Sequence, residues 1–231
     1  MLLRNYLLSL VNKAKSNNDK NIFSLLEENN KANLLDLGCA DGEWTLKLGE
    51  AVGTKNLFGI ELSTNLASES VKKNIQCVVS NLNDNFPFTD NFFDIIHANQ
   101  VIEHLFDLEK FINEIFRVLK PDGYVIISTE NLASWHNVFS LLFPCQPFST
   151  TNNTLKALGN PLSLWKNHPT TVEKSWCHSK LWAYRGLIEF FESYNFKVKK
   201  IMGAGYYPLP SFLGNIDKRH CHWISLKIAK I

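Results

Sequence analysis

The chain has 231 residues, 45% hydrophobic and 20% charged, which is long and apolar enough for one well-buried domain and excludes a disordered chain. Its formal net charge of +2 is too small to indicate a nucleic-acid partner. The five cysteines form no CxxC pair, so neither a disulfide framework nor a zinc knuckle is indicated, and we expect reduced thiols in the cytoplasm.

Residues 1–30 are expected to form an N-terminal helical segment packed on a sheet. Asn, Asp and Lys residues around positions 16–20 predict a break between two short helices. The order of charged and apolar residues at the start is not that of a signal peptide. No apolar run approaches the roughly 20 residues that cross a bilayer, so we expect no membrane span.

Short apolar runs then alternate with segments of helical periodicity. This alternation is typical of right-handed crossovers and a parallel α/β sheet. Strands are expected at 33–37, 56–60, 75–79, 93–98, 124–128, 196–201 and 223–229, and helices at 43–52, 63–73, 107–119 and 180–194.

Residues 130–178 interrupt this alternation with prolines, polar residues and many aromatic side chains. The segment is too apolar for a disordered linker and too irregular for a crossover helix. Long irregular segments in compact domains are often functional, so we expect a lid inserted after the fifth strand that binds a substrate. The whole chain, 1–231, is expected to be one domain.

The first strand runs into the loop Gly38-Cys39-Ala40-Asp41-Gly42, where a small molecule can lie against bare backbone at the carboxyl end of a strand. Glu61 ends the next strand, and an acid about twenty residues after such a loop is suited to the hydroxyls of a ribose. The loop lacks the third glycine of a dinucleotide site and the Lys-Ser/Thr of a P-loop. Carboxylates at Asp36 and Asp41 instead favour a positively charged nucleoside without phosphate.

Several segments, in this order, resemble the class I S-adenosylmethionine-dependent methyltransferases, in particular the small-molecule subgroup of the type 11/12 kind. They are Leu34 to Gly42, Gly59 to Ser63, Ser80 to Leu82, Phe86 to Phe88, Asn91 to Ile96, Asn99 to Leu105 and Arg117 to Gly123. The resemblance covers residues 33–130. It implies a Rossmann-like, doubly wound, mostly parallel sheet of seven strands with one antiparallel strand near the C-terminus.

The resemblance also implies the cofactor S-adenosyl-L-methionine and a methyl-transfer reaction. Asn81 stands where the family usually has an acid that contacts the adenine amine, which is a departure from the pattern. The residues expected to bind the cofactor are Asp36, Gly38, Cys39, Ala40, Asp41, Gly42, Glu61, Leu62, Asn81, Leu82, Asn99 and Gln100.

His104 is the candidate catalytic residue, because it follows the cofactor crevice and histidine titrates in the useful range for a general base. A structural role is the alternative, and Glu103 is expected to be structural. The spacing of Cys177-His178 and Cys221-His222 matches no common zinc pattern. We therefore expect no metal ligands, and none among His136, His168 and His220.

The sequence thus predicts a cytoplasmic enzyme, a monomer or homodimer, that methylates an oxygen or nitrogen of a small molecule. Quinone precursors, saccharides and secondary metabolites are all open as acceptors. Three alternatives remain. A cofactor-binding scaffold without turnover is favoured only by Asn81, a nicotinamide-dependent reductase is opposed by Asp41, and methylation of RNA or protein lacks a basic groove.

Overall fold

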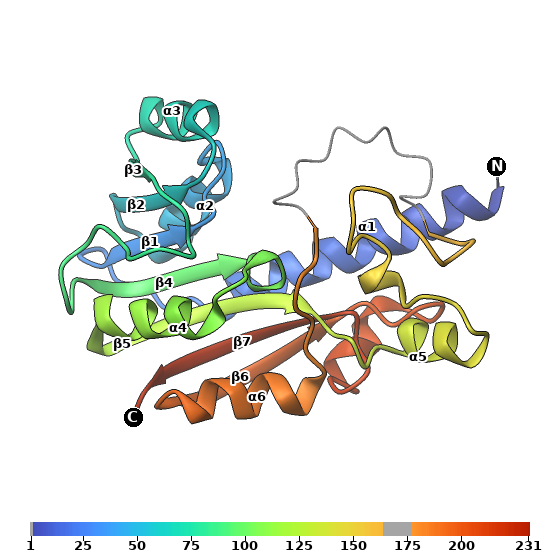
Figure 1. Ribbon diagram of the computed structural model, residues 1–231. Coiled ribbons are helices and arrows are strands. Elements are labelled where there is room, and N and C mark those ends of the chain that lie inside the picture. The colour runs from blue at the N-terminus through green and yellow to red at the C-terminus, as the bar shows by residue number, and fades with distance from the viewer. Residues whose placement is uncertain (1, 164–176) are drawn as a thin grey trace.

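A seven-stranded sheet in the order β3-β2-β1-β4-β5-β7-β6 forms the centre of the molecule (Figure 1). The structure is a computed structural model that describes residues 2–163 and 177–231. Among the described strands β7 alone runs opposite to the other six, and it pairs antiparallel with both β5 and β6. The strands are β1 (Asn33–Leu37), β2 (Asn56–Glu61), β3 (Gln76–Val79), β4 (Phe93–Asn99), β5 (Leu119–Glu130), β6 (Phe196–Ala204) and β7 (Trp223–Lys230).

Helices cover both faces of this sheet, and each face has its own apolar core. One core contains buried side chains of α4 and α6, and the other contains buried side chains of α1 and α2. Together with the strand order, this confirms the expected Rossmann-like, doubly wound fold. The helices are α1 (Leu2–Phe23), α2 (Glu43–Val52), α3 (Thr64–Lys72), α4 (Leu108–Val118), α5 (Trp135–Leu142) and α6 (Tyr184–Ser193), with 3-10 turns at η1 (Ile102–His104), η2 (Phe148–Thr150) and η4 (Ser211–Asn215).

The N-terminal segment is one helix, so the predicted break around residues 16–20 is wrong. The asparagines there make tertiary hydrogen bonds and do not end the helix. Asn18 Nδ2 donates to Ser128 Oγ at 2.9 Å, and Asn21 Nδ2 donates to the Gly203 carbonyl at 3.0 Å. Because these buried side chains are satisfied by the sheet, they do not compete with the helical backbone.

Two side-chain caps fix where helices begin. Ser63 Oγ accepts from the Leu66 amide at the start of α3, and Asp107 Oδ1 accepts from the Lys110 amide at the start of α4. Each cap satisfies one backbone donor that has no partner inside the helix. β5 begins earlier than the predicted strand 124–128, and it includes residues 121–123, beside which the pairing register with β4 shifts between Phe93 and Ile95.

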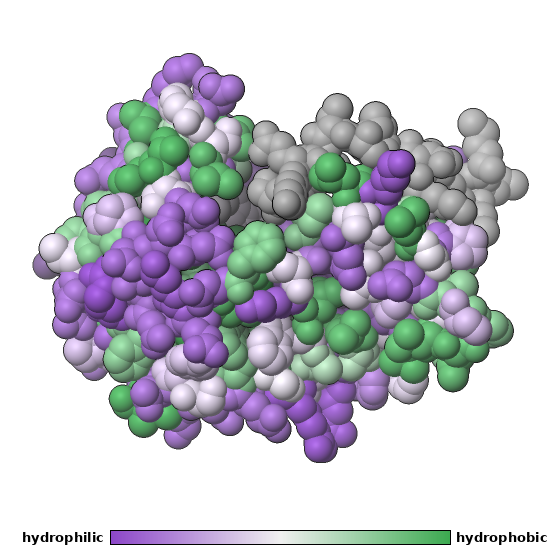
Figure 2. All heavy atoms as spheres, in the orientation of Figure 1, coloured by the Kyte–Doolittle hydropathy of each residue, from purple (hydrophilic) through white to green (hydrophobic). Residues whose placement is uncertain are grey.

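The segment after β5 forms α5, η2 and irregular chain up to residue 163. Residues 164–176 of the expected lid, including His168, lie outside the described residues. Figure 2 shows hydrophobic side chains gathered over α5, where Phe139, Leu142 and Phe143 are exposed. In the described parts of the chain, no helix combines the length and apolar character that a membrane crossing requires.

Candidate active site

The doubly wound order leaves a switch point between β1 and β4, because the chain turns to opposite sides of the sheet from these two strands. Open α/β sheets bind ligands at the carboxyl ends of strands at such a point. The loop 38–42 follows β1, and Asn99 and Gln100 stand at the end of β4. These predicted residues are therefore brought to one edge of the sheet.

Positive φ angles shape the loop after β1. Gly38 has φ 76° and Gly42 has φ 82°, a conformation that glycine adopts without steric cost. A Cβ on Gly38 would lie 3.1 Å from Val101 Cγ2, which shows how closely the segment after β4 packs on the loop. A Cβ on Gly42 would lie 2.5 Å from Ile75 Cδ1. The loop thus exposes backbone where side chains have no room.

Glu61 ties this loop to the end of β2. One carboxylate oxygen accepts from the Ala40 amide at 3.0 Å, and the other accepts from the Ser63 amide at 2.8 Å. A carboxylate has about four lone-pair sites, so both oxygens retain acceptor capacity for a ligand. Next to it, the Leu62 side chain is 53% exposed and offers an apolar surface for a flat ring.

Asp36 lies beneath the loop and is used inside the protein. Its side chain accepts from Thr45 Oγ1 at 2.6 Å and lies 2.7 Å from His97 Nδ1, and the residue is only 2% exposed. His97 Nε2 in turn lies 3.4 Å from Trp44 Nε1. Asp36 therefore holds β1, α2 and β4 together under the loop, and Thr45 and His97 are partners that the sequence pattern did not signal.

Asp41 does not present a free negative charge. Lys73 Nζ lies 3.1 Å from both Asp41 Oδ2 and Glu43 Oε1, and it donates to the Asp41 carbonyl at 2.7 Å. The hydrogen bond from Lys73 lowers the pKa of Asp41. The expectation that Asp36 and Asp41 line one anionic notch is corrected here, because each carboxylate already has its own partner within the protein.

Cys39, in the loop, and Asn81 and Leu82, after β3, present different groups to a ligand at this edge of the sheet. The Cys39 side chain turns under the loop, 3.4 Å from Cys77 Sγ, and this contact and burial raise the pKa of its thiol. Asn81 is exposed and its Oδ1 accepts from the Asn83 amide at 3.0 Å, while Leu82 packs partly buried against the core. Cys39 therefore offers backbone only, and Asn81 offers a polar side chain.

Two buried polar atoms at the end of β4 have no hydrogen-bond partner among the described residues. They are Asn99 Oδ1, an acceptor, and Gln100 Nε2, a donor. Gln100 has φ 56°, and its Oε1 accepts from Trp223 Nε1 at 3.0 Å. Leaving such groups unpaired costs about 1–3 kcal/mol each, so this edge of the sheet is prepared for a polar ligand.

His104 lies in η1, just after these residues. Its Nδ1 is 3.3 Å from the Cys177 carbonyl, and its ring meets that of His178 with centroids 4.9 Å apart. Burial, and to a smaller extent the neighbouring His178, lower the pKa of His104 to about 4. Burial also raises the pKa of Glu103 to about 8. The contact with His178 was not visible in the sequence, because His178 lies 74 positions after His104 in the chain.

A second polar group lies at the ends of β5 and β7. His222 Nε2 lies 3.6 Å from Glu130 Oε1, and the His222 ring meets that of His136 at 4.7 Å. Burial raises the pKa of Glu130, but the pairing with His222 outweighs it, and the value is about 2. Burial holds the pKa of His136 well below its usual range. Histidines and carboxylates thus surround the region beyond His104.

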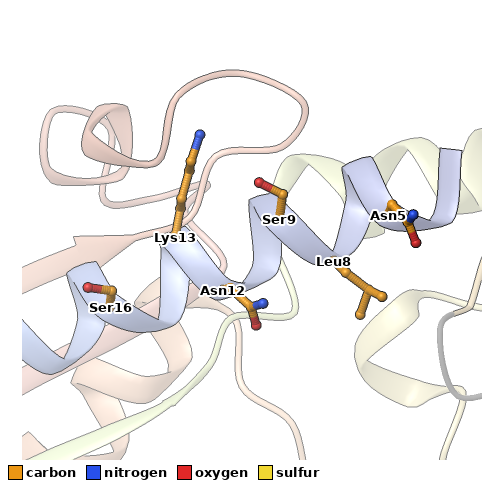
Figure 3. A pocket seen from close by; sticks show the side chains of 6 residues that line it. All are labelled: Asn5, Leu8, Ser9, Asn12, Lys13 and Ser16. Carbon is orange, nitrogen blue, oxygen red and sulfur yellow. The ribbon is translucent and has the colours of Figure 1, made fainter. Parts of the chain in front are cut away.

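A hollow of about 500 Å³ lies elsewhere, along α1 (Figure 3). Its described lining comes from α1 alone and includes Lys13 as its only charged side chain. Since it has no carboxylate, histidine or glycine loop in that part of the chain, we do not place the active site there.

Residues 35–127 match the family described as a methyltransferase domain. This match covers about two fifths of the chain and includes the glycine loop and Glu61, and the sheet order agrees with a methyltransferase domain of the Rossmann-like fold.

The chain is similar to demethylmenaquinone methyltransferase from Staphylococcus epidermidis, with 32% identity over 133 residues, or 54% of this chain and 55% of that protein. It therefore spans about half the length of the curated relatives it matches.

Solved structures show the same fold at low identity. A chain in the complex between the Haloferax volcanii Trm112 methyltransferase activator and the putative methyltransferase has a TM-score of 0.63 at 15% identity, covering 91% of this chain and 88% of that one. A putative S-adenosylmethionine dependent methyltransferase from Listeria monocytogenes has a TM-score of 0.62 at 16% identity, covering 92% and 96%.

Proposed function

We propose that this protein transfers a methyl group from S-adenosylmethionine to an oxygen or nitrogen atom of a small molecule. The observation that carries the proposal is the pair of unpartnered buried atoms, Asn99 Oδ1 and Gln100 Nε2, beside the glycine loop. One is an acceptor suited to an ammonium group and the other a donor suited to a carboxylate. The amino-acid end of the cofactor supplies both groups and leaves neither atom unsatisfied.

The other end of the cofactor fits the second strand. In our proposal the ribose hydroxyls donate to Glu61, the adenine lies on Leu62, and Asn81 replaces the usual acid near the adenine amine. Gly38, Cys39, Ala40 and Gly42 offer backbone, while Asp36 and Asp41 shape the loop through their protein partners. Figure 1 shows β1 and β2 side by side; the loop follows β1, and Glu61 is the last residue of β2.

Methyl transfer is an in-line displacement that depends mainly on a dry site and a well-placed acceptor atom. The bond from carbon to the sulfonium sulfur breaks with its electrons going to sulfur, and the acceptor atom forms the new bond to carbon. His104 is the candidate that takes a proton from the acceptor. Its Nδ1 faces the Cys177 carbonyl, which leaves the lone pair of Nε2 available.

The acceptor is proposed to enter over residues 130–178, whose described part contributes His136 and the aromatic side chains of α5. The curated relatives are named for demethylmenaquinone, so an aromatic quinone precursor is the first acceptor class to test. A saccharide is the second, because aromatic faces also stack on sugars. We propose a cytoplasmic monomer or homodimer that acts without nucleic acid.

Calorimetry with S-adenosylmethionine, followed by measurement of S-adenosylhomocysteine formed with a panel of quinols, sugars and amines, tests this function. Binding with product formation supports the proposal. Binding without product for any acceptor favours the scaffold alternative suggested by Asn81, and absence of cofactor binding overturns the proposal altogether.

A further inference from the structure

Three side chains with metal-binding atoms come together beside the candidate active site. Glu103 and His104 belong to η1, and His178 follows residues 164–176 in the chain. One ligand atom from each lies within 4.8 Å of the others. The sequence did not suggest this set, because two of its members are adjacent and the third lies 74 residues further on.

Both imidazoles are held in the orientation that metal-binding histidines adopt. His104 Nδ1 faces the Cys177 carbonyl at 3.3 Å, and His178 Nδ1 faces the Ser149 carbonyl at 2.6 Å. A carbonyl only accepts, so each Nδ1 carries the hydrogen and each Nε2 keeps a lone pair. A backbone carbonyl on the other ring nitrogen is the usual support of a metal-bound histidine.

The carboxylate of Glu103 supplies an independent observation. The residue is 1% exposed, its Oε2 accepts from Thr129 Oγ1 at 2.9 Å, and its buried Oε1 has no partner among the described residues. A buried polar atom without a hydrogen-bond partner is rare in protein interiors, because leaving it unpaired costs about 1–3 kcal/mol. A cation bound between Glu103 and the two histidines removes this cost.

We propose that Glu103, His104 and His178 form a site for a divalent transition-metal ion such as Zn²⁺. Two imidazole nitrogens and one carboxylate favour such an ion over Mg²⁺, which prefers oxygen ligands. Zinc bonds of about 2.0–2.2 Å require ligand atoms about 3.4 Å apart in a tetrahedron. The three ligand atoms already lie within 4.8 Å of one another, so each pair closes by at most about 1.4 Å on binding. Three protein ligands leave a position open.

The consequence for catalysis rests on the proposed function, whereas metal binding does not. An acceptor hydroxyl at the open position releases its proton to solvent more readily, because the ion stabilises the oxyanion that remains. With the ion bound, the Nε2 lone pair of His104 is used as a ligand, and its role as proton acceptor is confined to the metal-free protein. η1 follows the carboxyl end of β4, at the edge of the sheet where the loop 38–42 follows β1.

The test is metal binding by the full chain after chelator treatment, measured by calorimetry with Zn²⁺ and by the visible spectrum with Co²⁺. Glu103→Gln and His178→Ala are compared with His220→Ala, whose side chain instead pairs with Asp217. We expect one ion per chain, a Co²⁺ spectrum without thiolate bands, and affinity at least tenfold weaker in the first two variants only. Circular dichroism confirms that each variant is folded.

Equal affinity in all variants, thiolate bands from the free cysteines, or no binding by the folded wild-type chain would overturn the inference. Calorimetry with S-adenosylmethionine on the same samples tests the proposed function separately. Metal binding without cofactor binding supports the metal site and contradicts the methyltransferase proposal. Cofactor binding without metal binding supports the methyltransferase proposal and contradicts the metal site.

Discussion

Replacement of Glu61 by alanine is the sharpest test of how the cofactor is held. In the structure both carboxylate oxygens face backbone amides, from Ala40 at 3.0 Å and Ser63 at 2.8 Å. Our proposal adds the two ribose hydroxyls as further donors. Glu61→Ala removes these acceptors and also releases the loop at Ala40, whose φ is 48°.

The size of the effect follows from the hydrogen bonds lost. A hydrogen bond to a charged group contributes about 1.5–3 kcal/mol, and 1.4 kcal/mol is tenfold in affinity. Losing the equivalent of one such bond therefore weakens S-adenosylmethionine binding by at least about tenfold. Both amides lie near the surface and can bond water instead, so the free energy of unfolding should change far less than the binding free energy.

The assay is calorimetric titration of S-adenosylmethionine into wild type, Glu61→Ala and Glu61→Gln. Glutamine keeps one acceptor oxygen and the size of the side chain, so its affinity should lie between the other two. Glu69→Ala is the matched control, because Glu69 is an exposed acid on α3 that pairs with Lys72. If Glu61→Ala binds the cofactor within twofold of wild type, the proposed ribose site is wrong.

Three further predictions concern the loop, its support and the catalytic candidate. Gly42→Ala should lower the free energy of unfolding in urea by about 1–3 kcal/mol more than Gly53→Ala. Both glycines have φ near +80°, but only at Gly42 would an added Cβ meet neighbouring atoms. Equal losses in the two variants would contradict the packing argument. Thr45→Val should cost about 1–3 kcal/mol by leaving buried Asp36 short of a donor, and an unchanged urea midpoint would refute this. His104→Ala should lower kcat at least tenfold with cofactor affinity retained, whereas His220→Ala should not, and unaltered turnover in the first variant removes its catalytic role.

Local sequence determined the α/β alternation and the position of most elements. Buried strands such as 33–37 and helices with a side-chain cap such as Ser63 are written in short patterns, because they depend on neighbours along the chain. The glycine loop belongs to the same class, since positive φ at Gly38 and Gly42 is a local steric demand. The order of the motifs, through the family resemblance, also predicted the seven-stranded sheet with one antiparallel strand.

Contacts between distant residues decided the rest. Asn18 and Asn21 resemble helix breakers in sequence, yet the sheet satisfies them and α1 continues. Asp41 looks like a free anion until Lys73 is placed beside it. The hydrogen bonds of the two asparagines and the ion pair of Asp41 depend on contacts between residues far apart in the chain, and short sequence patterns do not predict such contacts.

The sequence by itself thus determined that the loop 38–42 exposes its backbone at the end of β1, and which side chains follow this loop. Only the tertiary structure decided the electrostatic state of that edge. It paired Asp41 with Lys73, buried Asp36 against Thr45 and His97, and brought His178 to His104. The physical reason is that ion pairs and hydrogen bonds depend on the distance between atoms in space. For residues far apart in the chain, that distance is fixed only when the sheet has formed.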